Sequence, residues 1–548
     1  MSKAVPQGPA FVDFTWTLAE LPTSQHRAGL AGLVLMLRWL DRQPDRAVGI
    51  CQIVSCDEKQ ASIRVDRLGL QRLFDWLYAA STEETRRQQP YKNKDDTTKE
   101  PLRMETEEVT AAKTGKVTTK TWYVYPVNVP SGGPIVDWAP SSEDPSKGWV
   151  KLWRDFVWTI MRGVPAQRGP YNERAEGKPC GDAAKEWLAL TKVRPGPIEL
   201  ASTYLIGAMA ATAENVAFKD VARFRFLLHF WPLVAQLYVP RTIDREGKVE
   251  AAGFAVAIPD VVDLDTFCAA LPQMLAARSA ISFGYRPKEA FVDLALESAL
   301  DCQRRLREQL GARFGDQSVA DVVLGFDVFQ MEKAGNSVRI LASCRCEPTP
   351  QMVDEYARVR TAYWSPIFRR QRLFNLAAGR PWHDGFDRVL QTADWHTVMP
   401  RARPEESRRQ ANEAAKQFQH DARQAFESTE ESMDESKPIQ TPEQLVYRAI
   451  GSYLSQKLKN KHGLSWKAAQ GDSAGEQAFS EARQKIAREV FLAVRSRTGA
   501  EFVDYFATTL FSVPQHMNED VFVSLAQALH ADPDRIRTLT LLALSARA

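Results

Sequence analysis

Strand-forming patterns in this sequence are confined to about the first 350 residues. There, short runs rich in β-branched residues alternate with helical patterns; "AVGICQIVSC" and "ASIRVD", for example, flank the turn "DEKQ" and predict a hairpin. From residue 405 onward the patterns are almost entirely helical. We therefore predict an α+β fold, in which a mixed N-terminal domain of short hairpins and helices is followed by an all-α C-terminal helical bundle.

The length of 548 residues exceeds what one hydrophobic core usually serves, so the chain is expected to contain several domains. The residues at about 81–116 are polar and rich in both charges, which predicts an exposed insertion because such a segment buries little. The predicted organisation is an α+β body over residues 1–350, a helical segment rich in arginine and aromatic residues over 351–426, a linker over 427–442 and a helical bundle over 443–548.

The bulk composition limits the possible classes of protein. The net charge is only +3, from 71 basic and 68 acidic residues, so any binding of nucleic acid must come from local patches. The seven cysteines lack the spacing of zinc sites, and their odd number argues against a disulfide framework. Neither a signal peptide nor an apolar run long enough to cross a bilayer is recognisable. We expect a soluble, cytoplasmic protein without a membrane partner.

The stretch "LPTSQHRAGLAGLVLML" at residues 21–37 predicts a helix with Thr23 or Ser24 at its N-cap. Gly29 and Gly32 do not form a phosphate-binding loop, because no G-K-[S/T] follows and they do not form a G-x-G-x-x-G motif after a strand. Glycine inside a helix is unfavourable, so this pair predicts the close approach of another element. We interpret His26 as a structural residue.

Metal-dependent chemistry has one candidate, "RPWHDGFDRVLQTADWH". It contains residue types that bind metals in nucleases and phosphohydrolases: His383, Asp384, Asp387, Asp394 and His396. A capped surface helix accounts for the same residues, and the eight histidines of the chain form no second cluster. Motifs of serine hydrolases, zinc proteases and P-loop enzymes are also missing. We therefore expect no enzymatic activity, no cofactor and no metal, with a nuclease using the His383 and Asp384 cluster as the alternative.

Nucleic-acid binding is better supported by the sequence. Residues 358–388 contain seven arginines and only two acidic residues, and the aromatic residues Tyr363, Trp364, Phe368, Phe374 and Trp382 are interleaved with them. Guanidinium groups bind phosphates in a bidentate manner, and aromatic rings stack on exposed bases. Basic residues also gather in the loop at 165–180 and in the insertion. The predicted nucleic-acid-binding residues are Lys92, Lys94, Lys116, Lys120, Arg162, Arg168, Tyr171, Asn172, Arg174, Lys178, Arg369, Arg370, Arg372 and Arg380. The alternative is that these residues are solvated helix faces and that the aromatic residues belong to the core.

Three stretches in order, "LPTSQHRAGLAGL", "GFAVAIPDVVDLDTF" and "VFQMEKAGNSVRIL", resemble the large subunit of type I CRISPR surveillance complexes (Cascade). The resemblance is to the Cas-eight family, in its Myxococcus-type (Cmx-eight), type I-B-like branch, and it spans most of the first 400 residues. It implies a subunit without a catalytic site that lies near the 5′ handle of the CRISPR RNA, reads the protospacer-adjacent motif on duplex DNA, helps to open the strands and recruits a separate helicase–nuclease.

The partners implied by the resemblance are the CRISPR RNA, the target double-stranded DNA with its displaced single strand, the other Cascade subunits (backbone, handle-binding and small subunits) and a helicase–nuclease or transposition proteins. A scaffold that binds only the CRISPR RNA is a further alternative. In several branches the large subunit ends in a helical domain like the small subunit, which is sometimes made from an internal start. Met433 lies in the predicted linker after Glu430 and Glu431, whose codons can be purine-rich, so we predict a separate product of residues 433–548.

Overall fold

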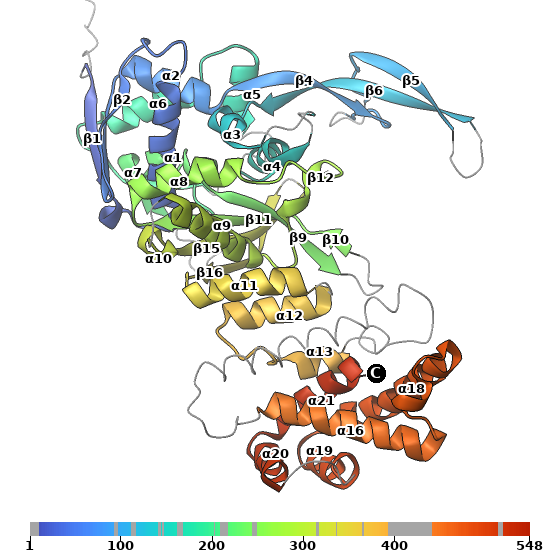
Figure 1. Cartoon of the computed structure of the whole chain (residues 1–548). Coiled ribbons are helices and arrows are strands. Elements are labelled where there is room, and N and C mark those ends of the chain that lie inside the picture. Colours follow the sequence, from blue (N-terminus) through green and yellow to red (C-terminus); the bar gives the residue numbers. More distant parts are fainter. Residues whose placement is uncertain are drawn as a thin grey trace, which may run out of the picture. The chain divides into compact units, whose positions relative to one another are not determined.

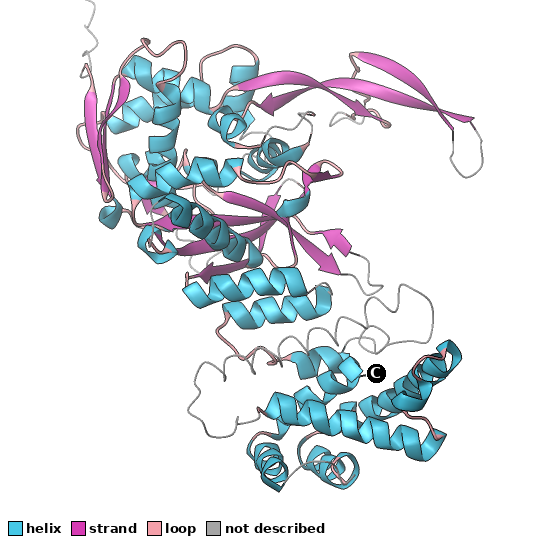
Figure 2. Ribbon diagram, viewed as in Figure 1, coloured by secondary structure: helices cyan, strands magenta, loops and turns pink. Residues whose placement is uncertain are grey.

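The computed structural model describes residues 10–92, 97–110, 117–140, 144, 147–161, 168–201, 203–208, 218–243, 249–313, 317–335, 337–363, 366–392, 441–512 and 519–547, and the structural statements below concern these residues. The chain divides into two compact units, Met1–Pro350 and Gln351–Ala548. All described strands lie in the first unit, and the described elements after residue 350 are helical (Figures 1 and 2). The predicted α+β fold class with an all-α C-terminal region is confirmed. None of the described helices has the length and apolar character needed to cross a membrane.

Helix α1 (Ser24–Leu40) is the centre of the first unit, and nearly all of its side chains are buried. It begins at the predicted N-cap, where the hydroxyl of Thr23 accepts a hydrogen bond from a backbone N–H of the first turn. At Gly29 and Gly32 the helix meets the backbone carbonyl groups of Leu227 and Phe230 so closely that a methyl group at either glycine would overlap them. The predicted close approach is confirmed.

A six-stranded sheet packs against α1. Its strands follow the order β10-β9-β11-β15-β16, with β14 beside β9, and all pairs are antiparallel except β14 with β9. The central strand β11 is buried along its whole length; α1 and α9 pack against the sheet, and α8 packs against these two helices. The strands and the two further helices are β9 (Gln236–Ile243), β10 (Val249–Ala251), β11 (Phe254–Val261), β14 (Phe291–Val292), β15 (Val323–Ala334), β16 (Ser337–Cys346), α8 (Leu264–Ala276) and α9 (Glu297–Arg313).

The other elements of the first unit surround this core. The hairpin predicted around "DEKQ" is present as β2 and β3, which form a three-stranded sheet with β1. The bounds are β1 (Val12–Thr17), β2 (Cys51–Cys56), β3 (Gln60–Val65), α2 (Arg67–Leu77), α3 (Gly133–Trp138), α4 (Gly148–Phe156), a π-helical turn (Val157–Met161), α5 (Gly169–Ala175), α6 (Gly181–Leu190), β7 (Ile198–Glu199), β8 (Lys219–Asp220), α7 (Ala222–Leu227), a 3-10 helix (Trp231–Leu233), β12 (Ser282–Phe283), β13 (Arg286–Pro287) and α10 (Val319–Val322).

The predicted insertion takes part in a β-structured arm. Strands β4 (Ala80–Arg87), β5 (Arg103–Thr110) and β6 (Val117–Pro130) form an antiparallel sheet in the order β4-β6-β5, which projects from the body of the first unit (Figure 1). The sequence predicted an exposed insertion here, without strands of its own. The difference arises because β4 and β5 are held by backbone hydrogen bonds to β6 rather than by buried apolar side chains, so their sequence lacks the usual apolar alternation.

The second unit is a set of helices. Helix α16 starts at a capping box of Thr441 and Gln444 and ends at Gly463, whose φ of 66° is the left-handed conformation that glycine adopts most easily. Helix α21 is almost entirely buried and packs against α16 and α18. The bounds are α11 (Pro350–Ala362), α12 (Pro366–Ala377), α13 (Phe386–Thr392), α16 (Pro442–His462), α17 (Trp466–Ala469), α18 (Ser473–Arg495), α19 (Gly499–Tyr505), α20 (Glu519–Ala531) and α21 (Pro533–Arg547). Met433 and nearly all of the predicted linker lie outside the described residues.

Candidate nucleic-acid interface

The predicted arginines on helix α12 differ in their exposure to solvent. Arg372 is only 2% exposed, donates to a carboxylate oxygen of Glu355, and has its Nε atom 3.3 Å from the hydroxyl of Tyr363. A guanidinium group held in this way stabilises the packing of α11 against α12 and does not face solvent. Arg370, in contrast, is partly exposed and forms no ion pair within the described part of the chain.

An exposed aromatic ring lies between accessible arginines on this helix. Phe374 is 46% exposed and lies one helical turn after Arg370, so the two residues share a face. The guanidinium carbon of Arg380 is 5.4 Å from the centroid of the Phe374 ring. We call Arg370, Phe374 and Arg380 the α12 patch. It offers two cations for phosphates and one ring face for a base. Arg380 also lies 3.3 Å from a carboxylate oxygen of Asp384, and this negative charge reduces the net positive charge of the α12 patch.

The remaining residues of the Arg-rich segment are mostly structural. Tyr363 and Phe368 are buried, and the ring of Phe368 stacks on that of Phe386 at 5.7 Å. For these two aromatic residues the core interpretation is correct. One nitrogen of Arg369 is buried, and Trp364 lies outside the described residues.

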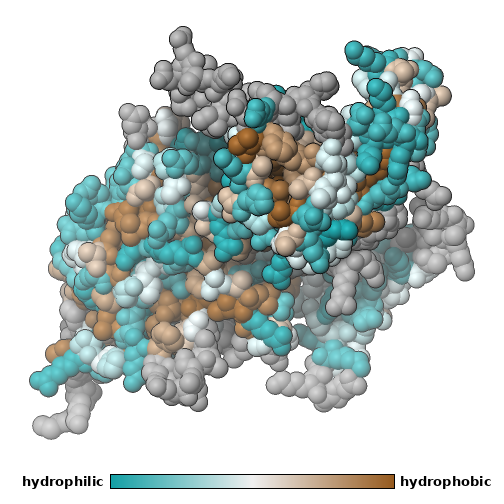
Figure 3. Space-filling view, turned by 90° about the horizontal axis from the view of Figure 1, so that it is seen from below, coloured by the Kyte–Doolittle hydropathy of each residue, from teal (hydrophilic) through white to brown (hydrophobic). Residues whose placement is uncertain are grey.

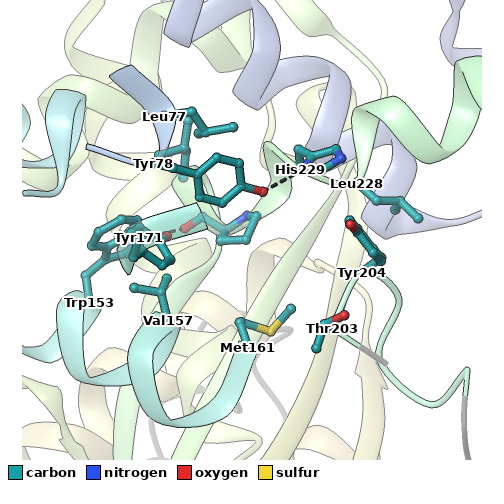
Figure 4. Close-up of a pocket in the computed structure, with 12 residues that line it drawn as sticks. Leu77, Tyr78, Trp153, Val157, Met161, Tyr171, Thr203, Tyr204, Leu228 and His229 are labelled. Atoms are coloured by element: carbon teal, nitrogen blue, oxygen red, sulfur yellow. Dashed lines mark hydrogen bonds between the residues drawn. The ribbon is translucent and has the colours of Figure 1, made fainter. Parts of the chain in front are cut away.

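The predicted loop at 165–180 contains helix α5, and its residues make contacts within the first unit. Tyr171 is buried and packs edge-on against Tyr78 and Trp158, with ring centroids 5.2 and 6.1 Å away. Tyr171 lines a cavity of about 30 Å³, and Figure 4 shows it near Tyr78, whose hydroxyl forms a hydrogen bond with His229. A nucleotide base does not fit into a cavity of this size, so Tyr171 has a packing role in this structure.

The polar residues of the same loop also have partners. Arg168 stacks on Trp158 at 4.4 Å, and Arg174 donates to the backbone oxygens of Asp75 and Lys178. Asn172 accepts a hydrogen bond of 2.9 Å from the amide of Asn128. The side chain of Lys178 is exposed and lies 2.7 Å from Glu176, and Arg162 lies outside the described residues.

The lysines of the arm lie in a surface of balanced charge. Lys120 is exposed on β6 directly opposite Glu107 on β5, and Lys92 is exposed beside the arm. Along the same sheet Arg103 pairs with Glu84 and Glu105 at 2.6 and 2.8 Å. These carboxylates weaken the attraction of the arm for phosphates. Lys94 and Lys116 lie outside the described residues.

The candidate metal ligands pair with arginines instead of converging on one point. Asp384 lies beside Arg380, and Asp387 is 3.8 Å from Arg537. Burial and then the positive charge of Arg535 lower the pKa of His383, so its imidazole is neutral at pH 7. The part of the chain that the structure describes contains no group of three or more His, Cys, Asp or Glu residues that could hold a metal ion. Asp394 and His396 lie outside it.

His26 is a structural residue, as predicted. Its side chain is buried, with one ring nitrogen 2.7 Å from the hydroxyl of Thr23 and the other 2.8 Å from a carboxylate oxygen of Asp220. The sequence contained no signal for Asp220 as the partner, because the two residues are 194 positions apart.

Comparison with models of known protein families shows to which family the chain belongs. Residues 50–316 match the model of the type I-B CRISPR Cas8b N-terminal domain, and residues 323–547 match that of the Cas8b C-terminal domain. The chain belongs to the Cas8b family. It is therefore a large subunit of a type I-B CRISPR system, and the predicted relationship is confirmed at that level. No curated protein matches the chain.

The two Cas8b domains share the central sheet of the first unit. The match to the N-terminal domain ends before β15, whereas β15 and β16 fall within the match to the C-terminal domain. Because β15 pairs with β11 over most of its length, the hairpin at the start of the C-terminal domain completes a sheet begun by the N-terminal domain. The compact units therefore divide after this hairpin, at residue 350, and not at the boundary between the two matches.

Proposed function

We propose that this Cas8b chain is the non-catalytic subunit of its complex that recognises the protospacer-adjacent motif and the target duplex. In the same proposal it stabilises the R-loop and recruits a helicase–nuclease or a transposition partner. Its direct partners are the CRISPR RNA, the target DNA with its displaced strand and the backbone, handle-binding and small subunits. Membership of the Cas8b family supports this role.

The α12 patch is the observation that carries the DNA-binding part of the proposal. Two accessible guanidinium groups beside an exposed phenylalanine suit a backbone phosphate and an unpaired base. The patch is small and the net charge of the chain is only +3, so strong binding to DNA requires the rest of the complex. Lys178, Lys120 and Lys92 remain as exposed residues for weaker contacts with phosphates.

The test measures binding of the reconstituted complex to a target-duplex library with a randomised flanking motif. Three samples are compared: the wild-type complex, the complex without this chain, and the R370A/F374A/R380A variant. We expect the chain to confer a motif preference without cutting DNA in Mg²⁺. The variant should bind about tenfold or more weakly, and the slope of log K against log salt should become shallower by about 1.8 for two lost phosphate contacts.

The matched control is F11A/R64A/R103A, which removes the same residue types from the first unit. Arg64 lies over the Phe11 ring at 4.5 Å, but Asp13 binds its guanidinium group through two hydrogen bonds, so it is not available to a phosphate. Equal binding and equal preference with and without the chain would refute the proposal. If the complex without this chain loses CRISPR RNA but keeps its motif preference, the chain is only an RNA scaffold. If the chain alone cuts DNA in Mg²⁺, it is a nuclease.

We also propose that the C-terminal bundle is made separately from Met433. Three observations support it: Met433 precedes the bundle, acidic residues that purine-rich codons can encode precede Met433, and α16 begins with its own N-cap at Thr441. Intact-mass analysis of the purified complex should show a chain of residues 433–548, which disappears when Met433 is replaced by leucine. A complex that contains the bundle only within the full-length chain excludes the internal start.

A further inference from the structure

The short hairpin of β12 and β13 presents aromatic side chains to solvent, and the sequence analysis did not identify it. Phe283 pairs with Arg286 across the hairpin, and the two-residue turn between them starts at Gly284, whose φ of 63° favours glycine. The backbone N–H of Lys288 donates to the carbonyl of Ile281, which extends the pairing by one step. We call residues 281–288 the aromatic hairpin.

The exposure of its side chains is unusual for a solvated turn. Phe283 is 74% exposed, Ile281 67% and Tyr285 48%. Figure 3 shows that other hydrophobic groups also reach the surface of the molecule, so exposure alone has no specific meaning. Here, however, two rings lie within three residues, at turn positions where polar residues are the rule. Such a concentration of exposed rings is typical of a binding surface.

Among the residues that the structure describes, the two cations beside these rings, Arg286 and Lys288, form no ion pair with an acidic residue. The guanidinium carbon of Arg286 is 5.1 Å from the Tyr285 ring, and its Nε–H is buried and lacks a hydrogen-bond acceptor among the described residues. Lys288 is exposed and forms no ion pair within the same part of the chain. The neighbouring carboxylate, Glu289, is occupied by Arg305 at 2.6 Å. The hairpin thus differs from the arm and from Arg380, where acidic residues face the basic ones, and it suits an anionic ligand.

The hairpin is held in place before any ligand arrives. The backbone N–H of Gly148 donates to the carbonyl of Tyr285, and the indole of Trp149 donates to the carbonyl of Ser279 at the base of the hairpin. The Phe283 ring contacts Phe291 edge-on, with centroids 6.1 Å apart. Figure 1 shows the hairpin at the edge of the first unit, where it packs against α4. Fixed rings lose little conformational freedom when they bind, which favours affinity.

We propose that the aromatic hairpin binds an unstacked base of single-stranded nucleic acid. In this proposal the base stacks on Phe283 or Tyr285, and the adjacent phosphates contact Arg286 and Lys288. The rings are sequence-tolerant because every base has a π-face, whereas the cations supply the salt-dependent part of the affinity. This inference rests on the proposed function, since a DNA-opening complex contains three sources of unpaired bases: the CRISPR RNA, the target strand and the displaced strand.

The first test replaces Phe283 with the photoreactive p-benzoylphenylalanine in the reconstituted complex. The CRISPR RNA, the target strand and the displaced strand are labelled in separate experiments. We expect a cross-link to one or two adjacent nucleotides of one strand, which identifies the source of the base. A cross-link only to another protein subunit, or none to any strand, would overturn the proposal.

The second test separates base stacking from ordinary apolar docking. Phe283 and Tyr285 are replaced together by tryptophan, by leucine or by alanine, and binding is measured on a target with a pre-opened bubble and on a fully paired target. Tryptophan should preserve binding, whereas leucine and alanine should weaken it by roughly fivefold or more, because only an aromatic ring stacks on a base. L188A/V193A, which removes two exposed apolar residues elsewhere, should have no effect.

The result also distinguishes this proposal from the proposed function. If leucine binds as well as tryptophan, the hairpin does not stack on a base, although the motif preference of the complex can remain. If the complex without this chain binds targets with unchanged preference, the proposed function fails. In that case the cross-link decides independently whether the hairpin contacts nucleic acid.

Discussion

Replacing Asp260 with alanine is expected to lower the free energy of unfolding of the first unit by about 3 kcal/mol. Asp260 is buried on β11 and accepts hydrogen bonds from Arg27 of α1 and from Arg345 of β16, the latter at 2.8 Å. Removal of the carboxylate leaves the partly buried guanidinium group of Arg27 without its counter-ion, and the cost of desolvating that charge is no longer offset. Amide hydrogen exchange in α1 and β11 should accelerate by about a hundredfold.

Asp265→Ala is the matched control for this prediction. Asp265 pairs with Arg38 of the same helix α1 at 2.8 Å, but its side chain is exposed. Water solvates both charges when the pair is broken, so the expected change is below about 1 kcal/mol. Equal effects of the two substitutions on hydrogen exchange would show that burial of Asp260 does not determine the stability of this network.

Gly32→Ala is expected to destabilise the first unit by about 2 kcal/mol. The added methyl group would overlap the carbonyl of Phe230, and a backbone group cannot rotate away as a side chain does. Overpacking costs up to about 3 kcal/mol, and alanine recovers about 1 kcal/mol through its higher helix propensity. Hydrogen exchange in peptides covering α1 and residues 222–234 should accelerate by about thirtyfold.

Gly311→Ala tests the same chemical change where there is space. Gly311 lies in α9, is exposed and has no atom within 4 Å of the position that a methyl group would take. Helix propensity is then the main effect, so this variant should be slightly more stable than the wild type. A Gly32→Ala protein that exchanges as slowly as Gly311→Ala would contradict the close packing of α1.

The sequence predicted features that depend on neighbouring residues. The N-cap of α1 at Thr23, the hairpin β2–β3 and the change to all-helical structure are all specified by residue type and periodicity over a short window. The strands β4 and β5 were not predicted, because their stability comes from pairing with β6 rather than from a local apolar pattern.

The candidate nucleic-acid interface was also predicted only in part. The sequence located the Arg-rich segment and its aromatic residues, but it does not show which side chains face solvent. Arg372 is buried and donates a hydrogen bond to Glu355, whereas Arg370 and Phe374 on the same helix are accessible to solvent. Tyr171 likewise became part of a cavity wall.

The sequence by itself determined the family, the order of the mixed and helical regions and the close approach at Gly29 and Gly32, because each follows from residue types in a local pattern. The tertiary structure decided which charges are neutralised by distant partners and which aromatic residues stay exposed. These outcomes depend on contacts between residues far apart in the chain, such as His26 with Asp220, and a pattern along the sequence does not contain them. For the same reason the aromatic hairpin became recognisable only when the burial of its rings and the partners of its cations were known.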